Sequence, residues 1–166
     1  MTITTAFEGQ VTLYSTRAGF AGPKVQPLAF QAQFDGAAWT VAPGDFRPVV
    51  VPDIVALGQR LTLTVTLAQP AAGQADPLTG RASLQAQFRF EFTGLPLPLA
   101  SLLPLVLDSG AAPAARWPGG PVVQGQPIQA PSGQMTLAGV GRFQGGPLDG
   151  DQAAVLLAGC FTPRPW

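Results

Sequence analysis

Apolar and polar residues alternate strictly along two segments of the chain. Between Leu61 and Leu67, leucine and valine alternate with threonine, and between Ser83 and Thr93 apolar residues alternate with polar or charged ones. A period of two residues places one kind of side chain on each face of a β-strand. The pattern therefore predicts two strands, and Asp76 to Gly80 between them has the composition of a turn. We expect residues 60–93 to form an antiparallel hairpin.

Other segments carry weaker versions of the same pattern. The last of them is apolar on both of its faces, which is typical of a central strand that is covered on both sides. Proline and glycine recur too often for a long helix, although 52–59 and 98–103 have room for one or two helical turns. The further strands are expected at 7–14, 28–34, 38–41, 47–51, 135–143 and 153–161.

These strands predict one all-β domain over residues 1–166. The strand over 83–93 is about 36 Å long at 3.3 Å per residue, about twice the common length. Such strands suit an antiparallel β-barrel, and a β-sandwich is the alternative because both folds give the same alternation. Residues 108–131 are rich in proline and glycine, so we expect a long irregular loop there.

Charge is scarce and balanced in this sequence. Charged residues make up 11% of the chain, against about 25% in ordinary globular proteins, and nine basic residues cancel nine acidic ones. A net charge of zero favours self-association, so we expect a homo-oligomer or a protein partner. The basic residues are scattered singly and form no stripe, which excludes nucleic acid as a favoured partner.

The usual catalytic residues are missing. The chain contains no histidine and a single cysteine, Cys160, and it has no glycine-rich phosphate loop. This excludes histidine-based triads, histidine metal sites and an intramolecular disulfide. Glu91 lies on the polar face of its strand beside Arg89, where a surface ion pair is expected unless that face points inward. We therefore expect no catalytic residue, no metal and no cofactor, and a protein that is not an enzyme.

Two groups of residues remain as candidate binding residues. Arg116 and Trp117 lie in the long loop, and an exposed Trp beside Arg is a common interface anchor, whereas a Trp folded onto the barrel wall would be structural. Five phenylalanines share the predicted inner face and either pack as a core or line an apolar cavity, with Leu95 to Leu107 as its mouth or lid. They are Phe30, Phe34, Phe88, Phe90 and Phe92.

The sequence as written shows no targeting or membrane-spanning segment. Its first residues lack the basic and apolar regions of a signal peptide. The longest apolar run, Leu95 to Leu107, is too short to span a bilayer and is broken by prolines. A cytoplasmic protein without a membrane span is the default expectation.

Near its C-terminal end the chain reads Leu137-Ala-Gly-Val-Gly-Arg-Phe-Gln-Gly-Gly146, followed by Gly150 and by Leu157-Ala-Gly-Cys-Phe-Thr-Pro163. This segment resembles the closing strands of allene-oxide-cyclase-like and dirigent-like β-barrels, which often carry Gly-x-Gly-Arg-Phe-x-Gly before a final strand. The resemblance implies a barrel with an apolar cavity and assembly into trimers or dimers. It carries over no pocket residues.

Two functional hypotheses follow. The first is a non-enzymatic structural or self-assembling β-domain that acts through protein–protein contacts, which the low charge and the absent catalytic residues favour. The alternative is a β-barrel that binds an apolar small molecule, either as a carrier or as an allene-oxide-cyclase-like isomerase. The phenylalanine-rich inner face and the C-terminal resemblance favour the alternative.

Overall fold

Ten β-strands make up most of the protein in a computed structural model, which describes residues 1–15, 23–56, 58–97, 99–110 and 124–166. Two short 3₁₀ helices, η1 (Pro43–Asp45) and η2 (Gly146–Leu148), lie between strands. The strands are β1 (Thr2–Ser15), β2 (Lys24–Asp35), β3 (Ala38–Val41), β4 (Val49–Ala56), β5 (Gln59–Leu67), β6 (Ala71–Ala75), β7 (Ala82–Thr93), β8 (Leu99–Asp108), β9 (Gln134–Arg142) and β10 (Gln152–Thr162).

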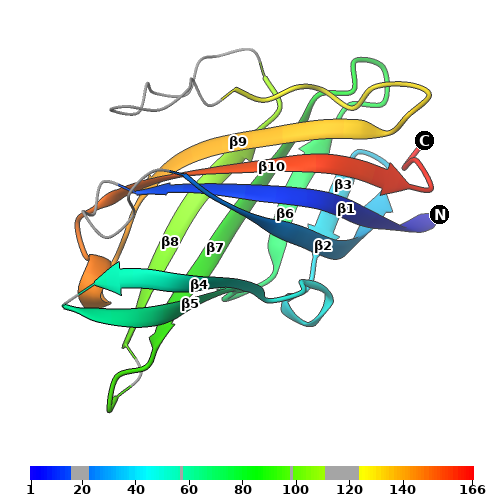
Figure 1. The fold of residues 1–166 in the computed structure, drawn as a ribbon. Coiled ribbons are helices and arrows are strands. Elements are labelled where there is room, and N and C mark those ends of the chain that lie inside the picture. Colours follow the sequence, from blue (N-terminus) through cyan, green and yellow to red (C-terminus); the bar gives the residue numbers. More distant parts are fainter. Residues whose placement is uncertain (16–22, 57, 98, 111–123) are drawn as a thin grey trace.

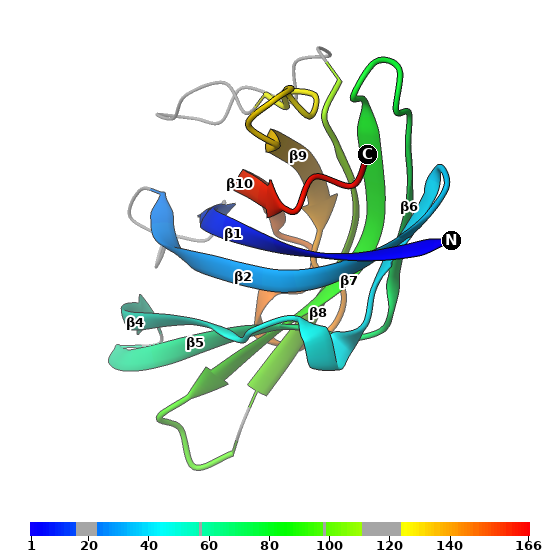
Figure 2. The same ribbon diagram turned by 90° about the vertical axis from the view of Figure 1, so that its right-hand side faces the viewer.

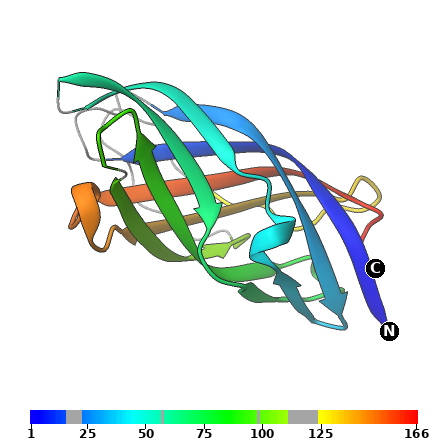
Figure 3. The same cartoon turned by 90° about the horizontal axis from the view of Figure 1, so that it is seen from below.

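Eight of the strands form a closed antiparallel ring in the order β7-β8-β9-β10-β1-β2-β3-β6, and the ring returns to β7. The chain is therefore all-β, as the alternation predicts, and of the two folds that fit this pattern it forms the barrel. In Figure 1 the layer β9-β10-β1-β2 lies in front of β6, β7 and β8. The first and last strands pair with each other, from Ala6 opposite Thr162 to Ser15 opposite Ala153. Both labelled ends of the chain consequently lie at one end of the barrel (Figure 3).

Phenylalanines dominate the barrel interior. Phe7 stacks on Phe30 with ring centroids 4.8 Å apart, and Phe34 stacks on Trp39 at 5.2 Å. The indole N–H of Trp39 is satisfied in the core because it donates to the carbonyl of Ser83 at 3.0 Å. Inward residues of every strand join these rings in one buried cluster. Its continuity explains why apolar residues recur at every second position.

The barrel wall differs between its two ends. One edge of β7 pairs with β6 over 82–85 and with β5 over 88–93. The hairpin β4–β5 therefore extends the wall on this edge of β7 beyond the point where the short strand β6 ends. No ladder joins β4 to β2 among the described strands, and the backbone N–H of Arg47 donates to the carbonyl of Ala29 where the two begin to diverge. Figure 2 shows this divergence. We call the unladdered line between β2 and β4 the seam.

Strand β9 contains glycines where β8 lies close against it. A Cβ atom on Gly139 would lie 2.3 Å from the carbonyl oxygen of Val106, and one on Gly141 would lie 2.7 Å from that of Pro104. A side chain at either position would force the strands apart. The two glycines of the Gly-x-Gly in the C-terminal segment thus allow the backbones of β8 and β9 to lie close together.

Several sequence predictions need correction. The strands around 60–67 and 82–93 do pair, but β6 lies between them in the chain, so the Asp76–Gly80 turn connects β6 to β7. Neither expected helical turn exists: residues 49–56 form β4, and the described residues from Leu99 to Asp108 form β8. The apolar run 95–107 is therefore largely a wall strand and not a lid. Since β8 continues to Asp108, the expected loop begins later than predicted.

The described residues contain no helix that is long and apolar enough to cross a membrane.

Candidate functional site

A second, smaller apolar cluster lies on the outside of the barrel wall. Tyr14, Ala138 and Ala154 are buried there, with Val140 and Leu156 packed against them, although their strands turn the opposite residues into the core. The cluster belongs to a larger set of outward residues on β9, β10, β1 and β2. The set is bordered by Glu8 at one end of the strands and by Arg142 at the other, and we call it the front face. Its residues are Gln10, Thr12, Tyr14, Val25, Pro27, Thr136, Ala138, Val140, Ala154, Leu156 and Ala158.

Strand register aligns these side chains in rows across the sheet. Val25 lies opposite Thr12, Thr12 opposite Leu156, and Leu156 opposite Ala138. In the adjacent row Tyr14 lies opposite Ala154, which lies opposite Val140. Directly opposed residues on one face have Cβ atoms about 4.5–5.5 Å apart, so each row is a continuous contact. The side chains of the front face therefore form continuous rows without a charged residue, and Tyr14, Ala138 and Ala154 in these rows are themselves buried.

Tyr14 is the polar member of the buried outer cluster. Its burial raises the pKa of the phenol above the ordinary value of 10.0, because desolvation penalises the phenolate. The side chain stays neutral at physiological pH, and its ring adds a large apolar area to the row. A ring of this kind suits a contact surface, where tyrosine is enriched.

The opposite side of the molecule carries charges. On β7 the Arg89 Nε donates to a Glu91 carboxylate oxygen at 3.1 Å, and both side chains are partly exposed. Glu91 thus belongs to a surface ion pair on the outward face, as the sequence predicts, and not to an inward polar site. Arg60 and Asp53 form a longer exposed contact of 3.9 Å on the β4–β5 hairpin. The front face, in contrast, has no charged residue among its members, although exposed Val50 and Val55 on β4 show that apolar residues also lie beside these ion pairs.

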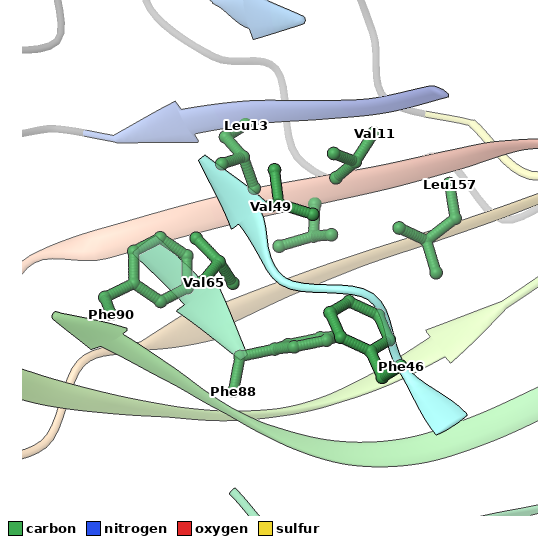
Figure 4. Close-up of a pocket in the computed structure, with 9 residues that line it drawn as sticks. Val11, Leu13, Phe46, Val49, Val65, Phe88, Phe90 and Leu157 are labelled. Atoms are coloured by element: carbon green, nitrogen blue, oxygen red, sulfur yellow. The ribbon is translucent and has the colours of Figure 1, made fainter. Parts of the chain in front are cut away.

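The five phenylalanines of the predicted inner face all lie in the buried core. Within the described part of the chain, two small cavities lie beside Phe30, Phe88 and Phe90, and each has a volume of about 10 Å³. That volume holds roughly one water-sized sphere, whereas small-molecule pockets measure about 300–1,000 Å³. Figure 4 shows one cavity with Phe46 and Phe88 side by side; their ring centroids are 5.7 Å apart. Packed rings fill this part of the barrel.

An open groove of about 430 Å³ lies at one rim, where β6, β7 and β8 end. Its lining includes Asp76, Arg81 and Asp108. Asp76 already accepts hydrogen bonds from the backbone N–H of Leu78 and the hydroxyl of Thr79, both at 2.9 Å. These bonds lower the pKa of the Asp76 carboxyl, with the Leu78 N–H as the largest cause. The Asp76 carboxylate thus stabilises the turn between β6 and β7 through these hydrogen bonds.

The sequence-predicted interface residues Arg116 and Trp117 lie outside the described residues. The front face was not singled out by sequence reasoning, although one signal pointed to it. The last strand is apolar on both faces, and the structure places it centrally between β1 and β9. Its outer face is covered only in part, because Ala154 is buried while Leu156, Ala158 and Cys160 keep intermediate exposure.

No protein-family model matches the chain, and no curated protein or solved structure matches it either. The chain is placed by its fold alone, as an all-β protein built on a closed eight-stranded antiparallel barrel with two additional strands. The resemblance of the C-terminal segment to allene-oxide-cyclase-like and dirigent-like barrels stays a prediction.

Proposed function

We propose that this protein is a non-enzymatic β-barrel domain that works through protein–protein contacts and assembles with copies of itself. The observation that carries the proposal is the front face, on which Tyr14, Leu156 and Val140 gather outside the core with no charge among them. Val25 is exposed, and Val140 and Leu156 are partly exposed; accessible apolar side chains that lie together mark interaction sites in soluble proteins. The zero net charge of the chain adds no repulsion between copies.

The packing of the interior favours this function over the carriage of an apolar molecule. Both cavities among the core phenylalanines are close to the volume of a single water, and their linings consist of Val, Leu, Phe and Ala side chains. A ligand would have to displace rings such as Phe46 and Phe88, which pack against each other.

Native mass spectrometry of the purified full chain tests the proposal, since it reports subunit number and retained small molecules together. We expect a defined oligomer whose mass matches protein alone. A monomer that carries an extra few hundred daltons would favour the apolar-ligand alternative. A bare monomer at high micromolar concentration would exclude self-assembly.

A further inference from the structure

Two exposed turns of the barrel contain an aspartate that is followed by a glycine. They are Asp35-Gly36, between β2 and β3, and Asp149-Gly150, between η2 and β10. Such a pair can react without an enzyme, because glycine has no side chain to keep its backbone nitrogen away from the carboxyl group of the preceding aspartate. The chain contains no asparagine, whose side-chain amide would react in the same way. The two Asp-Gly pairs are therefore the candidates for this chemistry.

The reaction joins the backbone to the side chain of the aspartate. The glycine nitrogen attacks Cγ of the protonated carboxyl group and loses its proton, and the carboxyl hydroxyl leaves as water, so that a succinimide ring forms. A water molecule then adds to one of the two ring carbonyls and opens the ring. Cleavage of the bond between Cγ and nitrogen restores aspartate. Cleavage of the original peptide bond gives isoaspartate, in which the main chain runs through the side-chain carboxyl group.

Both reacting groups are available at Asp35-Gly36. Gly36 has a φ of 63° and the φ of Ala37 is not positive, which is the pattern of a type II′ turn. The hydrogen bond of such a turn joins the flanking residues Asp35 and Ala38, so it leaves the Gly36 N–H unused. Neither this N–H nor the Asp35 carboxylate forms a hydrogen bond or an ion pair with another residue of the described ranges. A Cβ atom on Gly36 would meet nothing within 4 Å, so the turn also has room to rearrange.

Both reacting groups are held by hydrogen bonds at Asp149-Gly150. The Asp149 carboxylate accepts a hydrogen bond from the backbone N–H of Gly145 at 2.8 Å. The Gly150 N–H donates to the carbonyl of Phe143 at 3.0 Å. These bonds must break before the nitrogen can reach Cγ, and each lowers the reactive population about fivefold. Both pairs are exposed, so it is hydrogen bonding and not access to water that separates the two sites.

We propose that Asp35-Gly36 is a site of spontaneous isoaspartate formation in the folded barrel, and that Asp149-Gly150 is protected from this reaction by its hydrogen bonds. The inference goes beyond the proposed function and does not depend on it.

The site lies where the modification acts on the barrel wall. Isoaspartate adds one carbon atom to the main chain of the turn, and the ladder between β2 and β3 beyond this turn has three residue pairs. One of them is Phe34 opposite Trp39, whose rings stack with centroids 5.2 Å apart. The modified turn therefore loosens the pairing that holds this stack.

Incubation of the folded full chain at neutral pH in water enriched in oxygen-18 tests the proposal. Each ring opening inserts one heavy oxygen atom, and mass spectrometry of the digested protein with fragment spectra measures the uptake at each aspartate. We expect uptake about tenfold or more faster at Asp35 than at Asp149, and an isoaspartate form of the Asp35 peptide with a shifted retention time. Asp35→Glu should abolish uptake at this site, because the longer side chain would have to close a larger ring. Equal rates, or faster uptake at Asp149, would overturn the inference.

The chain unfolded in urea is the matched control. Its two Asp-Gly pairs lack the hydrogen bonds of the turns, so their rates of uptake should become similar. A difference between the sites that persists in urea would assign it to neighbouring residues and overturn the structural origin. Uptake at Asp35 that occurs in urea and is absent in the folded chain would overturn the reactive turn. None of these readouts depends on the subunit number, so self-association is tested separately.

Discussion

Single atoms decide how closely the wall strands approach one another. The hydrogen atoms of Gly139 leave room for the carbonyl group of Val106, which a Cβ atom would meet at 2.3 Å. In the interior, the single side chain of Phe88 lines both small cavities. At the rim, the carboxylate of Asp76 accepts the hydrogen bonds that hold the turn between β6 and β7. Each of these contacts makes a measurable prediction.

Gly139→Ala should destabilise the protein by about 1–3 kcal/mol, because the added methyl group pushes β9 away from the backbone of β8. Gly44→Ala is the control, since a Cβ atom there meets nothing within 4 Å. It should change the free energy of unfolding by less than about 0.5 kcal/mol. Urea unfolding of both variants gives the comparison, and equal stabilities would show that β8 and β9 do not need this close approach.

Phe88→Ala should cost about 3–5 kcal/mol of unfolding free energy, because it enlarges two cavities that the surrounding strands cannot collapse. Leu78→Ala serves as the control, since Leu78 is 94% exposed. Thermal and urea unfolding measure both variants. A loss below about 1 kcal/mol would contradict a well-packed interior and would renew the case for a bound apolar molecule.

The stability conferred by Asp76 should depend on pH. Its hydrogen bonds to Leu78 and Thr79 lower the carboxyl pKa in the folded state below the ordinary value of 3.8. A depressed folded-state pKa contributes stability that is present above the unfolded-state pKa and is lost as the pH falls through the folded-state pKa. The melting temperatures of wild type and Asp76→Ala should therefore differ at pH 7 and converge at pH values below about 4. A difference that stays constant down to pH 2 would exclude this origin.

Elements that are well paired on both sides were the easiest to predict. The expected strands 28–34, 38–41 and 153–161 all lie within observed strands. The first two show apolar residues at alternate positions, and the third shows the unbroken apolar run of a central strand. In contrast, β6 has the sequence Ala-Ala-Gly-Gln-Ala, which carries little strand signal and forms a strand because β3 and β7 flank it. Strand β8 was hidden because Pro104 and a run of leucines mask its alternation. The front face could not be predicted from the sequence, because it combines residues of four strands and the sequence does not show which strands are neighbours.

Strand β4, which lies outside the closed ring, should be less protected from hydrogen exchange than the central ring strands β1 and β10. One of its edges is unpaired at the seam, and a bulge interrupts the ladder on the other. Strands β1 and β10 have partners on both edges. Hydrogen–deuterium exchange followed by mass spectrometry should show faster exchange in peptides from β4 than in peptides from β1 or β10. Uniform protection across these strands would contradict an open seam.

At the scale of the whole molecule, two ion pairs lie away from the front face. The ion pairs Arg89–Glu91 and Arg60–Asp53 lie on β7 and on the β4–β5 hairpin, and the front face on the other side has none. Association through the front face should therefore depend on desolvation of apolar side chains and hardly on charge attraction.

The position of these ion pairs predicts how the proposed self-association responds to salt. Sodium chloride screens contacts between exposed charges, so an interface held by ion pairs weakens as salt is added. An assembly held by the front face should keep its dissociation constant in sodium chloride and associate more tightly in sulfate, which strengthens apolar burial. Sedimentation velocity across a salt series measures both effects. Dissociation of the assembly in high sodium chloride would point to charged residues as the contact.

The pairing of β1 with β10 has a consequence for synthesis on the ribosome. Strand β1 is made before the other nine described strands and pairs with β2, which follows it, but its other edge stays without a partner until β10, the tenth of them, has emerged. Until then the nascent sheet is open, and Phe7, Val11 and Leu13 lack the neighbours that bury them in the finished barrel. The ring therefore closes only after β10 has emerged, and a polypeptide that stops before β10 is left with an exposed apolar sheet that chaperones would have to bind.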